Sequence, residues 1–383
     1  MANPLFTTKP LAKLQEEAAD TEGLKRQLGG VNLVMLGIGA IIGAGLFSLT
    51  GLAAANNAGP AVTIAFVVAA VGCAFAGLCY AEFASMIPIA GSAYTYSYAT
   101  MGEFMAWIIG WDLVLEYAVG AATVSISWSQ YLTKFLSYYD VHLPVELTHS
   151  PWETVTMADG SVVSGMINLP AVFIVVVLSL LLIKGTRESA LFNGIIVMLK
   201  VSVVIVFIFL GYNYVNPANY TPYIPENTGV FGEFGWSGIF RAAAVVFFAF
   251  IGFDAVSTAA GEARKPQRTV PVALVSTVVV ATLLYVAVGV VLTGLVPYQE
   301  LNVSDPISKA LREAGPLSWL DDLVNVAAVV GLFATVLVTL YGQVRILMRM
   351  ANDGMLPPVF SRIDPHRRTP VATTVACGAA CAV

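Results

Sequence analysis

The stretch Leu33-Val-Met-Leu-Gly-Ile-Gly-Ala-Ile-Ile-Gly-Ala-Gly-Leu-Phe-Ser-Leu-Thr-Gly-Leu52 decides the fold of this chain. It is long and apolar enough to span a bilayer, yet glycine occurs at positions 37, 39, 43 and 45. Glycine costs about 1 kcal/mol relative to alanine inside a helix. Irregular backbone survives at membrane depth only where protein or a water-filled cavity covers it. The stretch is therefore typical of an interrupted transmembrane helix.

A second apolar span, near residues 239–260, carries a similar interruption at Phe250-Ile-Gly-Phe-Asp254. Two interrupted spans in separate halves of a membrane protein indicate a solute site near the bilayer midplane. Tight packing of small residues is an alternative for the first span, because Gly39 and Gly43 form a G-x-x-x-G pair. The two interruptions together predict a transporter.

The composition places the chain among polytopic membrane proteins. Its 383 residues are 57% hydrophobic and only 11% charged, and the mean hydropathy is +0.78. A net charge of -5 argues against nucleic acid as a partner, because nucleic acid requires a basic face. The sequence has no metal-ligand cluster, nucleophile elbow or phosphate-binding loop. We therefore expect neither an enzyme nor a bound cofactor or metal.

Windows of about 20 apolar residues predict an all-α membrane protein. The expected helices cover residues 32–56, 61–87, 103–138, 168–184, 189–214, 238–261, 270–296 and 317–350, and a ninth begins at Pro370. The chain ends at Val383, before that ninth span is complete. We expect a longer protein, truncated here within the ninth span.

The distribution of positive charge predicts the orientation. With the N-terminus in the cytoplasm, 14 of the 19 Lys and Arg residues lie on the inner side. The expected outer loops, 139–168 and 215–237, contain no Lys or Arg. This asymmetry follows the positive-inside rule. We expect a multi-pass protein of the cell membrane, surrounded by the lipid bilayer; whether a small membrane subunit accompanies it is left open.

The two interruptions suit the two charged groups of an amino acid. Unpaired N–H groups and helix N-termini attract anions, so the backbone of Gly43-Ala44-Gly45 is suited to a carboxylate. Carbonyls freed in the second interruption can accept hydrogen bonds from an ammonium group. The predicted substrate-binding residues are Ile41, Gly43, Ala44, Gly45, Glu116, Phe248, Ala249, Phe250, Ile251 and Asp254.

Ionisable residues inside apolar spans are functional candidates, because burying their charge is costly. Lys200 lies about 16 Å along the fifth span at 1.5 Å per residue, too deep to reach either surface easily. A lysine that gains and loses its proton there would couple transport to a pH gradient. The alternative is that Lys200 stays permanently protonated and has a purely structural role. Glu116 is deep enough to approach a central cavity, or pairs with a neighbouring helix, and Asp254 is placed to cap the helix after the second interruption.

At these residues the sequence resembles the amino acid–polyamine–organocation superfamily, and within it the bacterial cationic amino acid transporter family. The matching stretches are Met35–Phe47, Tyr80–Ala84, Gly91–Tyr98, Gly110–Tyr117 and Phe247–Thr258. The resemblance implies a leucine-transporter-type fold with broken helices 1 and 6 and two inverted five-helix repeats. A cytoplasmic segment, residues 1–30, would come first. The first repeat would cover residues 31–215, and the second would cover residues 238–383 and be incomplete at its C-terminus.

The resemblance also implies alternating access and assigns roles by position. The backbone at 43–45 would bind the substrate carboxylate and the region of Phe250 and Ile251 its amino group. Lys200 matches a fifth-span lysine that replaces a sodium ion and supports proton coupling in some relatives. Many relatives carry threonine or serine where this chain has Ala44, so no side-chain hydroxyl is available there.

These observations predict secondary active transport of L-amino acids, cationic or small neutral, coupled to proton import as in a symporter. An amino acid exchanger is the close alternative, and a receptor that binds amino acids without moving them is the more distant one. Substrate and protons are thus the expected small-molecule partners. The side-chain preference stays open, because Glu116 would attract a cationic substrate whereas apolar cavity walls would suit a neutral one.

Overall fold

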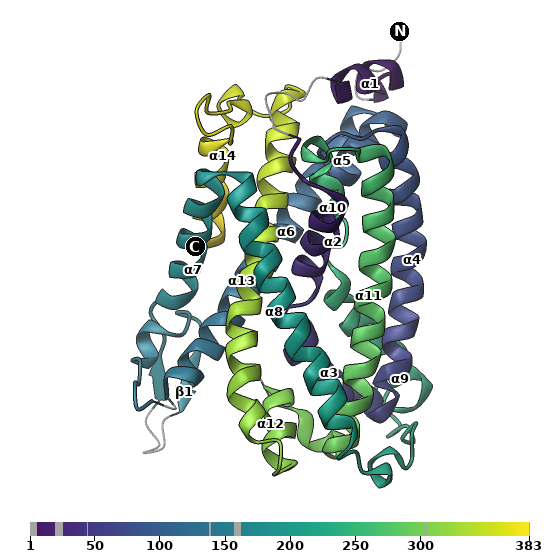
Figure 1. The fold of residues 1–383 in the computed structure, drawn as a ribbon, viewed down its shortest axis with the longest axis vertical. Helices are drawn as coiled ribbons and strands as arrows, with labels where there is room; N and C mark the ends of the chain where they lie inside the picture. Colours follow the sequence, from purple (N-terminus) through teal and green to yellow (C-terminus); the bar gives the residue numbers. More distant parts are fainter. Residues whose placement is uncertain are drawn as a thin grey trace.

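Long apolar helices standing side by side make up the molecule (Figure 1). A computed structural model describes residues 6–19, 26–43, 45–137, 139–156, 162–303 and 305–382. Within these residues, six helical segments are long and apolar enough to cross a membrane. They are Gly45–Met86, Glu103–Ser137, Ser189–Tyr212, Gly235–Thr258, Pro266–Leu295 and Trp319–Asn352. The protein is therefore mostly helical and polytopic, as its composition predicts.

The glycine-rich stretch is divided among several short elements. Helix α2 (Gly30–Ile41) ends where Ile42 turns to an extended conformation with ψ 90°. The chain resumes as the π-helical turn η2 (Gly45–Leu49), the single turn α3 (Thr50–Ala53) and a second π-helical turn, η3 (Ala54–Ala58). A short 3₁₀ turn, η4 (Gly59–Ala61), leads into α4 (Val62–Met86). Residues 42–43 thus lie outside regular helix.

The region around Gly252 has a similar organisation. Helix α9 (Gly235–Phe247) tightens into the 3₁₀ turn η7 (Phe248–Phe250), and helical structure resumes in α10 (Ala255–Thr258) and η8 (Ala260–Glu262). Gly252 has a φ of 99°, a conformation that glycine adopts without a steric penalty. The chain can therefore turn here, between α9 and α10, at the centre of the bundle.

The remaining elements complete the bundle. Their bounds are α1 Leu11–Ala19, α5 Ser92–Thr100, α6 Glu103–Ser137, α7 Leu169–Lys184, α8 Thr186–Tyr212, α11 Pro266–Leu295, α12 Pro306–Glu313, α13 Trp319–Asn352 and α14 Val371–Ala382. Strands β1 (Thr154–Thr156) and β2 (Val162–Ser164) pair antiparallel. Helix α2 packs against α8, α11 and α13, so the first half of the glycine-rich stretch lies inside the bundle.

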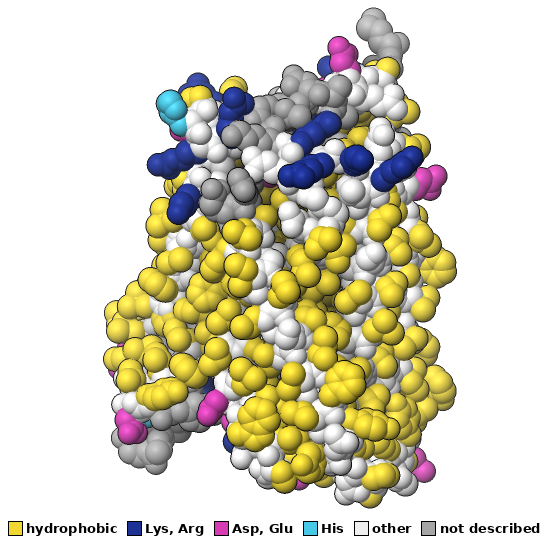
Figure 2. Space-filling view, viewed as in Figure 1, with side chains coloured by type: hydrophobic (Ala, Val, Ile, Leu, Met, Phe, Trp, Pro, Cys, Tyr) yellow, Lys and Arg dark blue, Asp and Glu magenta, His cyan; other side chains and the backbone are white. Residues whose placement is uncertain are grey.

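Charge separates the two ends of the molecule. Figure 2 shows a face that is mostly apolar from its middle to its lower end, with Lys and Arg side chains gathered at the end that carries α1. We call this the basic end; its exposed cations include Arg264, Lys265, Arg268, Arg362, Arg367 and Arg368. The β1–β2 hairpin and α12 lie at the opposite, hairpin end (Figure 1). A broad apolar surface with positive charge gathered at one end is what a bilayer-spanning protein presents.

Several short elements fall outside the helices that we predict from long apolar windows. Helix α1 and helix α12 are amphipathic, with sequences LAKLQEEAA and PISKALRE, and α5 has only nine residues. A window tuned to about 20 apolar residues passes over such segments. Leu14 of α1 is nevertheless completely buried, so the predicted polar N-terminal segment is partly helical and packed against the bundle.

Candidate substrate site between the two interruptions

A small cavity lies between the interrupted regions, with room for about one water molecule. Five predicted residues line it: Ile41, Gly43, Gly45, Phe248 and Ile251. Five further residues complete the lining: Ala40, Gly120, Val124, Thr335 and Thr339. The walls are therefore contributed by α2, η2, α6, η7 and α13, together with the non-helical residues next to the breaks. Predicted residue Ala44 lies outside the described part of the chain.

The two interruptions touch each other directly. A Cβ atom added at Gly45 would overlap the Cα and Cβ atoms of Ala249. One added at Gly43 would lie 2.7 Å from the Thr335 hydroxyl oxygen. Only glycine lets the backbone of η2 approach η7 this closely. The glycines that mark the first interruption in the sequence therefore have a packing role as well as a conformational one.

The hydroxyl of Tyr285, on α11, bridges the two interruptions. It lies 2.8 Å from the carbonyl oxygen of Ile41 and 2.8 Å from that of Ala249. The ring is completely buried and packs against Phe66 and Phe250. A hydroxyl has one proton to donate, so it can satisfy only one of the two carbonyls at a time. The arrangement leaves acceptor capacity for another donor.

Other carbonyls of the second interruption are partly used. The carbonyl oxygen of Phe250 accepts a 3.4 Å hydrogen bond from the N–H of Phe253, and that of Phe248 accepts one from Ile251. Among the carbonyls of the second interruption, that of Ala249 therefore accepts from the Tyr285 side chain and that of Phe250 from the backbone. Each carbonyl oxygen retains a second lone pair.

Lys200 holds the end of α2. Its side chain, on α8, is completely buried, and its Nζ donates to the carbonyl oxygens of Gly39 at 3.0 Å and Ile42 at 2.5 Å. The Thr335 hydroxyl donates to the Gly39 carbonyl at 2.9 Å. Carbonyls at the C-terminus of a helix carry partial negative charge. A buried ammonium is therefore stabilised here by backbone dipoles.

The two predicted carboxylates occupy different places. Asp254 is 5% exposed, and its Oδ2 accepts hydrogen bonds from the hydroxyls of Tyr117 at 2.6 Å and Ser92 at 3.0 Å. It links the second interruption to α5 and α6 but does not line the cavity. Glu116 is half-buried and also lies outside the cavity lining. The cavity lining therefore contains no charged side chain among the residues that the structure describes.

Sequence reasoning missed Tyr285, Thr335 and Thr339. Tyrosine and threonine are common in transmembrane helices as packing residues, so neither stands out in an apolar run. Only the fold shows that the Tyr285 hydroxyl reaches two interruptions located more than 200 residues apart in the sequence. The signal that the sequence offers is a tyrosine hydroxyl in the middle of a long apolar span, because a polar group at membrane depth needs a hydrogen-bond partner.

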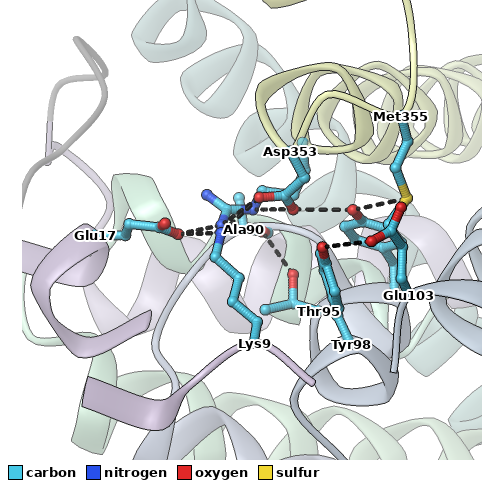
Figure 3. Close-up of polar contacts among 10 residues, drawn as sticks. Lys9, Glu17, Ala90, Thr95, Tyr98, Glu103, Asp353 and Met355 are labelled. Atoms are coloured by element: carbon cyan, nitrogen blue, oxygen red, sulfur yellow. Dashed lines mark hydrogen bonds and ion pairs between the residues drawn. The ribbon is translucent and has the colours of Figure 1, made fainter. Parts of the chain in front are cut away.

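A cluster of charged side chains lies at the basic end of the molecule. Figure 3 shows Lys9 and Glu17 of the N-terminal segment meeting Asp353 at the end of α13. Lys9 Nζ lies 2.7 Å from Glu17 and 2.5 Å from Asp353, and Arg349 pairs with both carboxylates. The Tyr94 hydroxyl, on α5, donates to Asp353 at 2.9 Å. The cluster fastens α1 to α5 and α13.

Comparison with known proteins identifies the family. A family model described as "Amino acid permease" matches residues 28–383. The chain is 42% identical over 370 residues to the methylthioribose transporter of Bacillus subtilis (strain 168), covering 97% of this chain and 76% of that protein. It is 44% identical over 377 residues to the branched-chain amino acid permease BcaP of the same organism, covering 98% and 77%.

A plant relative and a solved structure extend the comparison. The vacuolar cationic amino acid transporter 4 of Arabidopsis thaliana is 37% identical over 356 residues, covering 93% of this chain and 57% of that protein. The crystal structure of MhsT in complex with L-phenylalanine superposes with a TM-score of 0.64 at 13% identity, covering 94% of this chain and 79% of that one. The likeness to MhsT shows a shared fold. The chain belongs to the amino acid permease family of the amino acid–polyamine–organocation superfamily, a family of membrane transporters and not of enzymes.

Proposed function

We propose that this protein transports L-amino acids across the cell membrane by alternating access. The observation that carries the proposal is the cavity between the two interruptions, lined by backbone of η2 and η7. The backbone at 43–45 would hold the substrate carboxylate, and the carbonyls of Ile41 and Ala249, now bridged by Tyr285, would receive the amino group. Two relatives are named for amino acid transport, which supports this assignment.

The lining favours a small neutral side chain. Ala40, Val124 and Ile251 are apolar, and the polar side chains of the lining are those of Thr335 and Thr339. Burying a cationic side chain here without a carboxylate partner would be costly. We therefore propose small neutral L-amino acids as substrates ahead of cationic ones.

We further propose that protons drive this transport through Lys200. A protonated lysine carries three donors, two of which are used by the Gly39 and Ile42 carbonyls. A neutral amine still has two protons for these carbonyls, but its hydrogen bonds lose the charge that makes an ammonium a strong donor. Losing the proton would therefore weaken the attachment of α2 to α8. This would couple the position of α2 to the proton gradient.

The architecture that we propose follows the leucine-transporter type. Helix α2 and the η2–α3 turns would be the two halves of one broken span, and α9 and α10 the halves of another. Residues 31–215 and 238–383 would form the two inverted repeats. The basic end, with α1, would face the cytoplasm, because loops rich in Lys and Arg stay on that side.

The test is amino acid uptake by the purified protein in liposomes, with and without an inside-alkaline pH gradient. Alanine, leucine, arginine and lysine are compared. We expect gradient-driven accumulation of the neutral substrates, lost in Lys200→Ala while exchange is retained. Lys184→Ala, which alters an exposed lysine at the end of α7, serves as the matched control.

Other outcomes would select the alternatives. Uptake confined to vesicles preloaded with amino acid would indicate an exchanger, with Lys200 as a permanent strut. Saturable binding without flux would indicate a receptor. If Lys200→Ala and the parent protein accumulate amino acid equally, Lys200 has no role in proton coupling.

A further inference from the structure

The basic end carries a surface pocket of about 550 Å³ where α11 begins. Four of its lining side chains are basic, and among the described residues none of the lining is acidic. The basic ones are Arg26, Arg264, Lys265 and Arg268. Two glutamines and two prolines complete the lining. The transport mechanism proposed above uses none of these residues.

The positive charge of this pocket is not balanced by neighbouring carboxylates. Arg264, Lys265 and Arg268 are exposed, and none of them forms a salt bridge with an acidic residue in the part of the chain that the structure describes. Lys9 and Arg349, at the same end, both pair with carboxylates. The positive-inside rule accounts for cations at one end, but not for their gathering around one pocket. A cleft lined by one sign of charge concentrates ions of the opposite sign.

An apolar stripe runs along α11 from this pocket. Four of its side chains are exposed: Val272, Val275, Val279 and Leu283. Their spacing of three and four residues places them on one face of the helix, and Arg268 continues that face one turn earlier. At 1.5 Å per residue the stripe is about 16 Å long, which is about half of the roughly 30 Å hydrocarbon core. Its length therefore matches one leaflet of the bilayer.

An anionic phospholipid has both of the parts that these two features suit. Its phosphate accepts charge-assisted hydrogen bonds from guanidinium and ammonium groups, and its acyl chains are apolar. On the face seen in Figure 2, Lys and Arg side chains lie directly beside a hydrophobic surface. A free phosphate ion would use the cations and leave the stripe without a role. We propose that the pocket binds the headgroup of an anionic phospholipid, with an acyl chain lying along the stripe on α11.

This pocket joins two parts of the chain that are distant in the sequence. Arg26 precedes α2, whereas Arg264 and Lys265 precede α11. The N–H of Leu28 donates to the Glu262 carbonyl at 2.9 Å, and the N–H of Arg264 donates to the Leu28 carbonyl at 3.0 Å. A headgroup held here would contact both segments. Because a ligand that binds only the folded state stabilises it, the lipid should raise the melting temperature.

Native mass spectrometry of the purified protein tests the headgroup site. The protein is released from detergent that contains equal amounts of phosphatidylglycerol, which is anionic, and phosphatidylcholine, which is not. We expect the parent to retain phosphatidylglycerol preferentially. Joint Lys265→Gln and Arg268→Gln substitution should lower this preference about tenfold, because two cations beside the headgroup are lost.

Joint Arg362→Gln and Arg367→Gln substitution is the matched control. It removes the same charge from exposed residues of the basic end that do not line the pocket, so the preference should be unchanged. An equal loss in both variants would indicate diffuse attraction to the whole basic end and overturn the site. Equal retention of the two lipids by the parent would overturn it as well.

Photo-crosslinking of the parent protein in liposomes tests the stripe without any substitution. Phosphatidylglycerol with a photoreactive group in one acyl chain should label residues 272–283 several-fold more than α7, which ends at the basic end (Figure 1) and exposes Val176 and Leu180. The same reagent with a phosphatidylcholine headgroup should label both helices alike. Equal labelling of α7 and α11 by both reagents would overturn the proposal.

Thermal unfolding in neutral detergent separates the lipid from a free anion. We expect phosphatidylglycerol to raise the melting temperature of the parent, and phosphatidylcholine or millimolar inorganic phosphate to leave it unchanged. An equal rise with inorganic phosphate would assign the pocket to a soluble anion and overturn the lipid site. None of these three measurements depends on the proposed transport function.

Discussion

Tyr285 donates from one side chain to both interruptions. Replacing it by phenylalanine would leave the Ile41 and Ala249 carbonyls without their hydroxyl donor, at a cost of about 1–3 kcal/mol for buried unpaired groups. We expect Tyr285→Phe to lower the thermal stability of the substrate-free protein. Because a substrate ammonium would supply the missing protons, added amino acid should raise the melting temperature more in the variant than in the parent.

Thermal unfolding of the two proteins with and without leucine would measure this difference. Tyr139→Phe, at a tyrosine that is 67% exposed, controls for the loss of a phenol hydroxyl. An equal or smaller substrate-induced shift in Tyr285→Phe would contradict the proposed site for the amino group.

Gly45 marks the contact between the interruptions. We expect Gly45→Ala to force η2 away from Ala249, since the added Cβ would overlap backbone as well as side chain, and overpacking of this kind costs about 1–3 kcal/mol. Amino acid uptake should fall by about tenfold or more. Gly29→Ala is the matched control because nothing lies within 4 Å of a Cβ at that position; comparable uptake by both variants would show that the close approach is dispensable.

At the scale of elements, α1 is held by charge. Burial raises the pKa of Glu17, but hydrogen bonds from Lys9 and Arg349 outweigh this effect, and the pKa ends below its ordinary value of 4.5. A lowered pKa means that the ionised carboxylate stabilises the folded contact above the ordinary value, and that this stabilisation is lost as pH falls through the lowered one. We expect α1 to stay attached at neutral pH and to detach progressively below about pH 4.5.

Hydrogen exchange of the amides in α1 would follow this detachment. Glu17→Gln removes the charge and should accelerate exchange already at neutral pH. Glu16→Gln, one residue earlier and exposed, should leave it unchanged. A pH profile that is the same for the parent and Glu17→Gln would show that Glu17 does not hold the helix.

The elements differ in how far the sequence predicts them. Long apolar runs such as α6 and α13 are predicted nearly to their ends, because their length and composition suffice. Helices α1, α5 and α12 are short and partly polar, and their stability comes from packing that the sequence does not show. The glycines of residues 37–45 predict that a helix is interrupted here, close to where α2 ends. The hydrogen bonds from Tyr285 to Ile41 and from Thr335 to Gly39 could not be predicted, because they join segments that are distant in the sequence.

At the scale of the whole molecule, the separation of charge predicts a single orientation. We expect a cysteine at Trp152, which is 87% exposed at the hairpin end, to react with an impermeant reagent added outside intact cells. A cysteine at His366, exposed at the basic end, should react only after the membrane is opened. The reverse pattern would contradict a cytoplasmic N-terminus.

The partners of Lys200 also have a genetic consequence. In the part of the chain that the structure describes, its ammonium is held by the main-chain carbonyls of residues 39 and 42 and by no acidic side chain. Where a lysine pairs with an acidic residue, the loss of the lysine can be compensated by a second substitution that places the two charges the other way round. The carbonyl oxygens of residues 39 and 42 are present whichever amino acid occupies those positions, so no substitution there can reverse their charge. Selection for revertants of a Lys200 variant should therefore recover lysine itself or changes elsewhere in the bundle, and no charge swap at its partners.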